Sequence, residues 1–138
     1  MLERVALEFT RAEKRFIDDN DVARFATVDP DGIPHVVPVC YVHSSDAFWV
    51  ATDYGTRKYR SLQRNDKVAL LVDAGSASNC GILVQGRAKT FDRGPEFREI
   101  YDVFHRKFDW VREMPWKEGE APFVRIEPIR KVSWGPKQ

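Results

Sequence analysis

Cysteine and histidine, which often carry thiol and metal chemistry, are scarce in this sequence. It has two cysteines and three histidines in 138 residues. Cys40 and Cys80 each stand alone in an apolar segment, which predicts small buried side chains without a redox role. The histidines show no ligand spacing, and neither a CxxC nor an HExxH motif occurs, so the sequence predicts no metal site.

An excess of one charge is also lacking, because 22 Lys and Arg stand against 21 Asp and Glu, for a net charge of +1. This balance gives no reason to expect nucleic acid or a membrane as a partner. No apolar run is long enough to span a bilayer, and the first nine residues, MLERVALEF, lack the apolar core of a secretion signal. We therefore expect a cytoplasmic protein, and the chain length predicts a single domain over residues 1–138.

Motifs of catalysis by the protein's own side chains are missing as well. The sequence contains no GxSxG, no Gly-rich phosphate loop and no paired-carboxylate signature. Catalytic residues are therefore left unknown, and any redox chemistry would have to come from a bound cofactor.

Short strands separated by turn signals occupy most of the chain. Apolar patterning predicts strands over residues 24–28, 33–42, 47–52, 67–73, 80–91 and 122–134. Asp29-Pro30-Asp31-Gly32 supplies a hairpin turn, and Gly81, Gly86 and Pro128 indicate bulges or a close approach of two backbones. The pattern predicts a mainly β fold, a closed or nearly closed six-stranded antiparallel barrel.

Three helices are expected around this barrel. An apolar stripe predicts an amphipathic helix over residues 2–19, and a second one begins at Pro95 and ends before Pro115. Between them lies a short helix, with Thr56 as its N-cap and with Tyr59 and Leu62 on its apolar face.

This short helix carries cations where they are electrostatically unfavourable. Arg57 and Lys58 fall in its first turn and Arg60 follows, although a helix N-terminus is already partly positive. Such a cluster is explained if an anion such as a phosphate monoester binds there. The alternative is an ordinary solvated basic face, and the cluster alone leaves both interpretations open.

The same stretch resembles the flavin-phosphate segment of the pyridoxamine 5'-phosphate oxidase family. In that family a Thr ends a strand and Ser-Arg-Lys opens the next helix, as Thr52-Asp53 and Thr56-Arg57-Lys58 do here. The run 58–62, Lys-Tyr-Arg-Ser-Leu, is also similar to a segment of relatives that use a deazaflavin. The similarity extends from about Arg24 to Trp134. It implies an FMN-binding split barrel, with Ala51, Thr52, Thr56, Arg57, Lys58 and Arg60 at the cofactor.

The second strand contributes further to this resemblance. In the family the equivalent strand lines the flavin ring, which implies that role for Val36, Val37, Pro38 and Val39. His35 and Cys40 stand where the family has Arg and Lys, so two charged contacts are missing. Proline within a strand otherwise indicates an edge or a bulge. Gln85 is either a donor to a flavin carbonyl or a solvent-facing strand residue.

The resemblance also implies a homodimer with two cofactors at the interface, where Trp134 would lie beside the flavin held mainly by the other subunit. The alternative for Trp134 is a packing cap on the barrel. We expect an FMN-dependent oxidoreductase of unknown substrate. Pyridoxamine 5'-phosphate oxidase activity itself is not expected, because the family's C-terminal substrate segment has no counterpart in the four residues after Trp134. The alternatives are a reductase that uses coenzyme F-420 and a flavin carrier or redox sensor without turnover.

Overall fold

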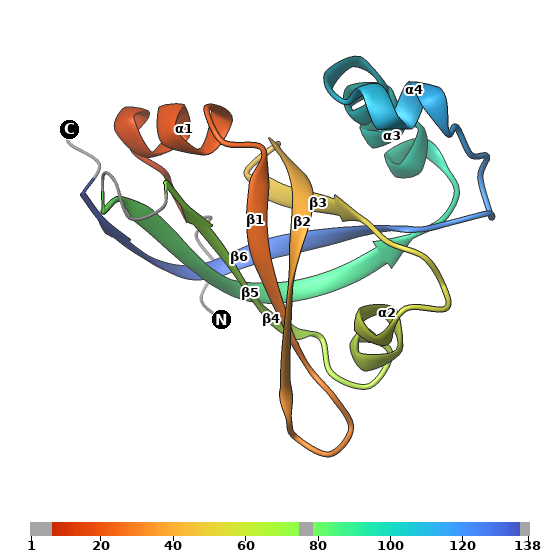
Figure 1. Ribbon diagram of the computed structural model, residues 1–138, viewed down its shortest axis with the longest axis horizontal. Helices are drawn as coiled ribbons and strands as arrows, with labels where there is room; N and C mark the ends of the chain where they lie inside the picture. The colour runs from red at the N-terminus through yellow and green to blue at the C-terminus, as the bar shows by residue number, and fades with distance from the viewer. Residues whose placement is uncertain (1–6, 75–78, 136–138) are drawn as a thin grey trace, which may run out of the picture.

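Residues 7–74 and 79–135 are described by the structure, a computed structural model. Six strands form a closed antiparallel barrel in the order β1-β2-β3-β6-β5-β4 (Figure 1). The strands are β1 (Val22–Val28), β2 (Pro34–Ser44), β3 (Ala47–Ala51), β4 (Lys67–Asp73), β5 (Gly81–Phe91) and β6 (Phe123–Trp134). The predicted six-stranded barrel is confirmed, with strand ends close to those expected.

The helices are α1 (Arg11–Asp18), α2 (Arg57–Leu62), α3 (Pro95–Lys107) and α4 (Asp109–Glu113). The prediction of one helix over residues 2–19 is wrong for residues 7–10, and residues 2–6 lie outside the described residues. Helix α1 begins late because Thr10 and Glu13 form a capping box. The Glu13 amide donates to Thr10 Oγ1 at 3.1 Å, and the Thr10 amide donates to Glu13 Oε1 at 2.8 Å.

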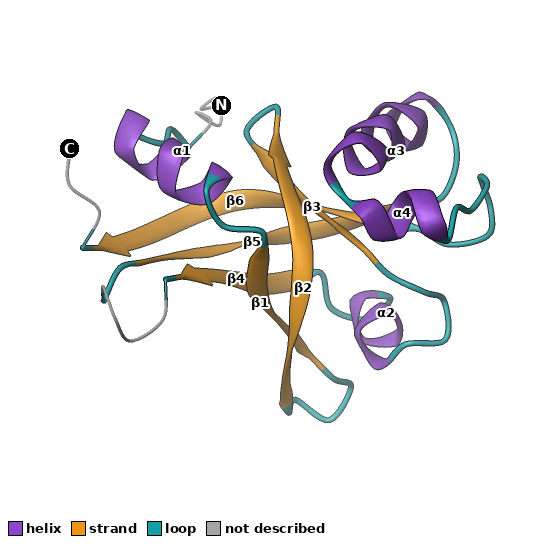
Figure 2. Cartoon of the chain, turned by 45° about the horizontal axis from the view of Figure 1, so that its top comes forward, coloured by secondary structure: helices purple, strands orange, loops and turns teal. Residues whose placement is uncertain are grey.

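The helix expected between Pro95 and Pro115 is instead two helices. Phe108 interrupts it with an extended backbone, at φ −118° and ψ 124°, and its side chain is buried. This turn brings α4 back against α3, so that both lie together beyond the ends of β3 and β6 (Figure 2). Their apolar side chains form a second core outside the barrel with Trp49 and Phe123.

Strand register decides which side chains fill the barrel. Val84, Leu70, Phe25 and Val37 pair side by side across β5, β4, β1 and β2, and they contribute to the interior core. The neighbouring row, Val132–Leu83–Leu71–Arg24–Pro38, pairs in the same way and therefore faces outward. The outer surface of these strands is thus substantially apolar.

Helix α1 closes one end of the barrel through buried polar contacts. The Tyr41 hydroxyl donates to the Ile17 carbonyl, and Lys131 forms an ion pair with Glu13, whose side chain is buried. Among the described residues, no helix combines the length and apolar character needed to cross a membrane. Cys40 and Cys80 are half-buried, not fully buried as expected.

Candidate functional site

The candidate site begins where β3 ends and the chain turns into α2. The Thr52 amide donates to the Pro122 carbonyl at 3.1 Å, which ties this turn to the segment before β6. Thr56 caps α2 as predicted, because its Oγ1 accepts from the Tyr59 amide at 3.2 Å. The Thr52 and Thr56 hydroxyls lie 3.0 Å apart in a hydrogen bond. The first turn of α2 is therefore fixed to the end of β3.

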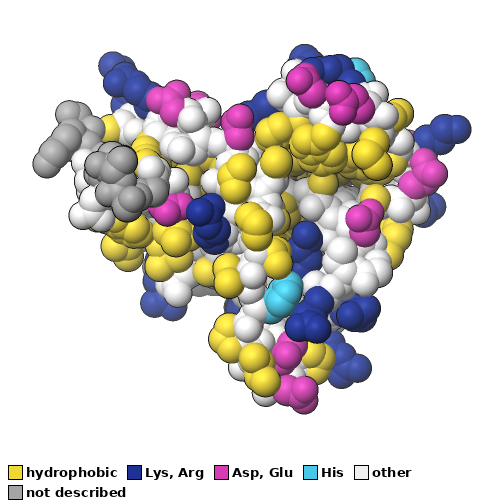
Figure 3. All heavy atoms as spheres, viewed as in Figure 1, with side chains coloured by type: hydrophobic (Ala, Val, Ile, Leu, Met, Phe, Trp, Pro, Cys, Tyr) yellow, Lys and Arg dark blue, Asp and Glu magenta, His cyan; other side chains and the backbone are white. Residues whose placement is uncertain are grey.

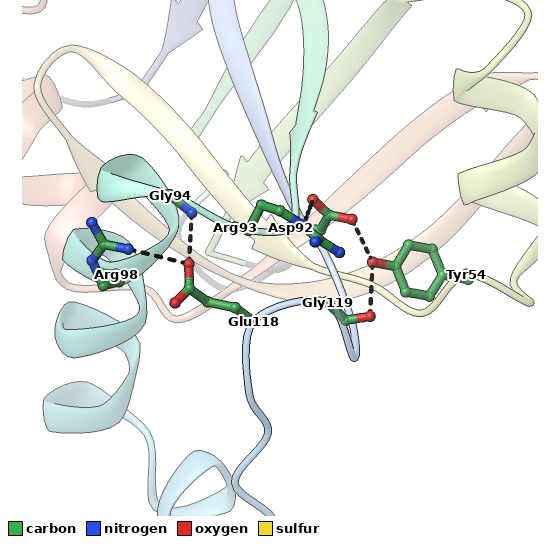
Figure 4. A network of polar contacts seen from close by, with 7 residues as sticks. All are labelled: Tyr54, Asp92, Arg93, Gly94, Arg98, Glu118 and Gly119. Carbon is green, nitrogen blue, oxygen red and sulfur yellow. Dashed lines mark hydrogen bonds and ion pairs between the residues drawn. The ribbon is translucent and has the colours of Figure 1, made fainter.

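A polar network holds the outer side of the same turn (Figure 4). The Tyr54 hydroxyl donates to Asp92 Oδ2 at 2.8 Å and to the Gly119 carbonyl at 3.3 Å. Burial and the hydrogen bond to Asp92 raise the pKa of Tyr54 to about 12, and the hydrogen bond from this hydroxyl lowers the pKa of Asp92. The Gly119 amide in turn donates to the Asp92 carbonyl at 2.7 Å. Three segments distant in sequence thus meet beside α2.

A second part of this network fixes the start of α3. Glu118 Oε1 accepts from the Gly94 amide at 2.6 Å and lies 3.3 Å from an Arg98 guanidinium nitrogen (Figure 4). The loop that precedes β6 is therefore held against α3 on one side and against Tyr54 on the other.

The three cations of α2 have different surroundings. Arg57 is exposed, and Arg60 donates to the Gly55 carbonyl at 3.1 Å. Lys58 is half-buried and makes no ion pair with another described residue, and burial lowers its pKa. In Figure 3, Lys and Arg side chains gather around α2 and the β1–β2 hairpin. Lys58 is the cation of this helix that is both partly desolvated and unpaired within the described chain.

Lys58 lines a cavity of about 340 Å³ between the end of β3, α2 and α4. Its lining residues are Ala51, Thr52, Asp53, Lys58, Trp110, Met114, Trp116, Glu120 and Ala121. The Trp110 and Trp116 rings are parallel within 5°, with centroids 6.0 Å apart. This aromatic wall was not predicted, although the two tryptophans on either side of Pro115 were a visible signal in the sequence.

Strand β2 offers a free backbone edge. Only residues 41–44 of β2 pair with β3, so among the described residues its first half pairs with β1 alone. The Tyr41 amide donates to Asp21 on the β1 side, and alternation along the strand then points the Pro38 nitrogen away from β1. Proline therefore removes no ladder bond here, as expected for an edge.

The side chains predicted to line a flavin ring divide between the two faces of this strand. Val37 and Val39 pack into the barrel core, whereas Val36 and Pro38 point outward and are exposed. A ligand at this strand would meet the outward side chains and the backbone edge.

Gln85 and Trp134 lie apart from the Lys58 cavity. Gln85 is exposed on the outer face of β5 and lines a different groove. The Trp134 ring covers Gly81, where a Cβ would overlap the indole, and 39% of the residue remains exposed. The structure therefore brings Ala51, Thr52, Thr56 and Lys58 together and leaves Gln85 and Trp134 on the outer face of β5 and β6.

Comparison with known proteins gives a family match. The model of the pyridoxamine 5'-phosphate oxidase family matches residues 9–130. The chain belongs to this family. The match confirms the resemblance seen in the sequence, and the barrel has the split-barrel fold expected for this family.

Three similar proteins show how varied members of this fold are. A 5a,11a-dehydrotetracycline/5a,11a-dehydrooxytetracycline reductase from Streptomyces rimosus is 27% identical over 137 residues, covering 94% of this chain and 84% of its own. An FAD-binding protein from Mesorhizobium loti superposes with a TM-score of 0.68 at 21% identity, covering 87% of both chains. HutZ, the heme storage protein from Vibrio cholerae, superposes with a TM-score of 0.72 at 19% identity, covering 88% of this chain and 90% of its own.

Proposed function

We propose that this pyridoxamine 5'-phosphate oxidase family member binds FMN and acts as an oxidoreductase. The observation that carries the proposal is Lys58, a half-buried cation without an ion-pair partner among the described residues, beside Thr52 in a cavity. Burying an unpaired cation costs free energy, and a bound phosphate would offset that cost. Arg57, the preceding residue, is exposed and does not line the cavity, and in this proposal it would add a bidentate contact from the surface.

The residues present fit the phosphate end of a flavin at one side of the cavity. Asp53 and Glu120 also line the cavity, and Asp53 attracts the Lys58 ammonium, so a bound phosphate would have to outweigh the repulsion from these carboxylates. The exposed backbone edge of β2 would support the flavin ring, with Val36 and Pro38 beneath it. A flavin, when bound, supplies the hydride and electron transfer, while the protein binds, orients and shields it.

The family and the similar reductase from Streptomyces rimosus support oxidoreductase activity, and the FAD-binding neighbour supports a flavin. Coenzyme F-420 remains the alternative cofactor, because Lys58 and Arg60 would serve it equally. Heme is not proposed, although HutZ shares the fold. No histidine, a common axial ligand of heme, lines the Lys58 cavity in the described part of the chain.

A homodimer is part of this proposal. The outward row has Val132, Leu83 and Leu71 on one side of Arg24 and exposed Pro38 on the other, with Trp134 at its margin. Arg24, which forms an ion pair with Asp73, interrupts this apolar face, but exposed apolar side chains grouped on one face still favour an interaction site more than single ones do. A second copy covering this face would bury it and place Trp134 near the partner's cofactor.

Reduction by NAD(P)H distinguishes an enzyme from a carrier. The protein loaded with FMN is mixed anaerobically with NADH or NADPH, and the flavin absorbance is followed before and after an electron acceptor is added. Bleaching followed by sustained turnover supports an oxidoreductase. Bound flavin that no nicotinamide reduces, or that is reduced without turnover over a panel of acceptors, contradicts the enzymatic part of the proposal.

A further inference from the structure

A second groove, separate from the Lys58 cavity, lies where the end of β1, the start of β2 and the start of β4 meet the middle of β5 and β6. It has a volume of about 430 Å³ and shares no lining residue with that cavity. Among the described residues, its lining includes three cations, Lys67, Arg87 and Arg130, together with Gln85, and no carboxylate. The Lys58 cavity, by contrast, is lined by one cation and two carboxylates.

Lys67 and Arg87 are placed directly opposite each other on β4 and β5. Like charges at such a position destabilise a sheet. Opposite charges nearby interact only weakly with this pair. The Asp66 carboxylate lies 4.0 Å from the Arg87 guanidinium, and both side chains are about half exposed. Glu127 is the β6 neighbour of Arg87, but the two form no ion pair and Glu127 does not line the groove.

A second like-charged pair on this sheet, by contrast, has aromatic contacts that offset the repulsion between its charges. Lys89 and Arg125 also face each other across β5 and β6. The Arg125 guanidinium lies 4.9 Å from the Phe91 ring centroid, and Lys89 lies 5.2 Å from the same centroid. These cation–π contacts stabilise that pair. Neither Lys67 nor Arg87 has such an aromatic contact among the described residues.

A β-bulge adds the third cation. The register of β5 and β6 shifts between Gln85 and Gly86, so that Gly86 pairs with Pro128 and Gln85 pairs with Arg130. Without the extra residue, Arg130 would pair with Val84, whose side chain points into the barrel. The bulge therefore turns Arg130 to the outer face, beside Gln85 and near Arg87, and bulges that re-aim a side chain are typical of functional sites.

We propose that this groove binds a phosphate-type polyanion through Lys67, Arg87 and Arg130, with Gln85 as a neutral donor. Two guanidinium groups and an ammonium provide the bidentate and point-charge contacts that phosphate oxygens accept. Two sources carry this chemistry: the phosphate end of a cofactor seated on a partner subunit, or a separate phosphorylated molecule.

The test is isothermal titration of the cofactor-free full chain with inorganic pyrophosphate at low salt. The double variant Lys67→Ala/Arg87→Ala removes two charged contacts, each worth about tenfold in affinity, so it should weaken binding about 100-fold. Arg130→Ala should weaken it as well. Lys89→Ala, on the same strand and face but outside the groove, is the matched control and should leave the affinity within about twofold.

Three further measurements distinguish this groove from the flavin site and identify its ligand. Lys58→Ala should retain pyrophosphate binding at the groove even where it impairs FMN binding, so the groove and the flavin site can fail independently. If FMN competes with pyrophosphate and binds more weakly to the groove variants, the groove holds the phosphate of a cofactor. If the FMN-loaded protein binds pyrophosphate as tightly as the cofactor-free protein, the groove holds a separate ligand. Absence of pyrophosphate binding, or equal weakening by Lys89→Ala and the double variant, overturns the proposal.

Discussion

Replacing Lys58 with methionine should change cofactor affinity and protein stability in opposite directions. Methionine keeps the length of the side chain and removes its charge. If Lys58 contacts the FMN phosphate, the loss of one charge-assisted hydrogen bond costs about 1.5–3 kcal/mol, which weakens binding about 10- to 150-fold. The cofactor-free protein should be unchanged or slightly more stable, because a half-buried cation without a partner among the described residues has been removed.

The pH dependence follows from the same side chain. Burial lowers the pKa of Lys58 in the free protein, and a bound phosphate would raise it again. Binding therefore favours the protonated amine. Above the second pKa of the FMN phosphate, about 6, affinity should be highest below the free-protein pKa of Lys58 and should decline as the pH rises toward its pKa in the complex.

FMN titrations followed by fluorescence quenching, together with urea unfolding of the cofactor-free protein, measure both effects. Lys14→Met, an exposed change of the same kind on α1, is the control and should alter neither quantity appreciably. Unchanged FMN affinity in Lys58→Met, at every pH, would refute the role given to this side chain.

Three other substitutions test the surroundings of the site. Tyr54→Phe removes the hydroxyl that joins Asp92 and Gly119, so it should lower stability in urea by about 1 kcal/mol and weaken FMN binding by loosening the turn before α2. Lys131→Met should destabilise the protein by about 2–3 kcal/mol at neutral pH because it strands the buried Glu13 carboxylate, and Glu13→Gln in the same chain should restore part of the loss. Burial would raise the pKa of Glu13, but hydrogen bonds from Lys131 and Thr10 outweigh it and lower the pKa, so this ion pair stabilises above about pH 4.5 and its contribution is lost as the pH falls further. The difference between wild type and Lys131→Met in urea unfolding should therefore shrink in acid, and a constant difference would be incompatible with the pair. Trp134→Ala should shift the protein from dimer to monomer in light scattering and lower FMN affinity, and a wild-type monomer with full FMN affinity would exclude the proposed interface.

Local patterns predicted the barrel because each strand carries its own signal. The strand from Lys67 to Asp73 has the predicted ends, and Thr56 caps α2 as its residue type suggests. The prediction of a helix over residues 2–19 followed the apolar stripe and therefore included residues 7–10, which are not helical. The Thr10–Glu13 capping box, a signal present in the sequence, marks the actual start. No proline or glycine marks the break between α3 and α4 at Phe108. The break comes with burial of the Phe108 side chain, which the sequence does not signal.

The site was less predictable because it depends on contacts between distant segments. Nothing in the sequence distinguishes the surroundings of Arg57, Lys58 and Arg60. The fold shows that Lys58 lines a cavity and that Arg60 donates a hydrogen bond to the Gly55 carbonyl. The network of Tyr54, Asp92 and Gly119 joins three separate turns and has no local signature. The bulge at Gly86 was expected, but the resulting orientation of Arg130 depends on the register of β5 against β6.

Titration of the cofactor-free protein with FMN, FAD and coenzyme F-420 tests the central claim most directly. A site at Lys58 and Thr52 that accepts a terminal phosphate predicts saturable binding of FMN, tighter than that of FAD or F-420, and weakened by Lys58→Met but not by Lys14→Met. Tighter binding of FAD or of F-420, or no saturable binding of any of the three, would contradict it.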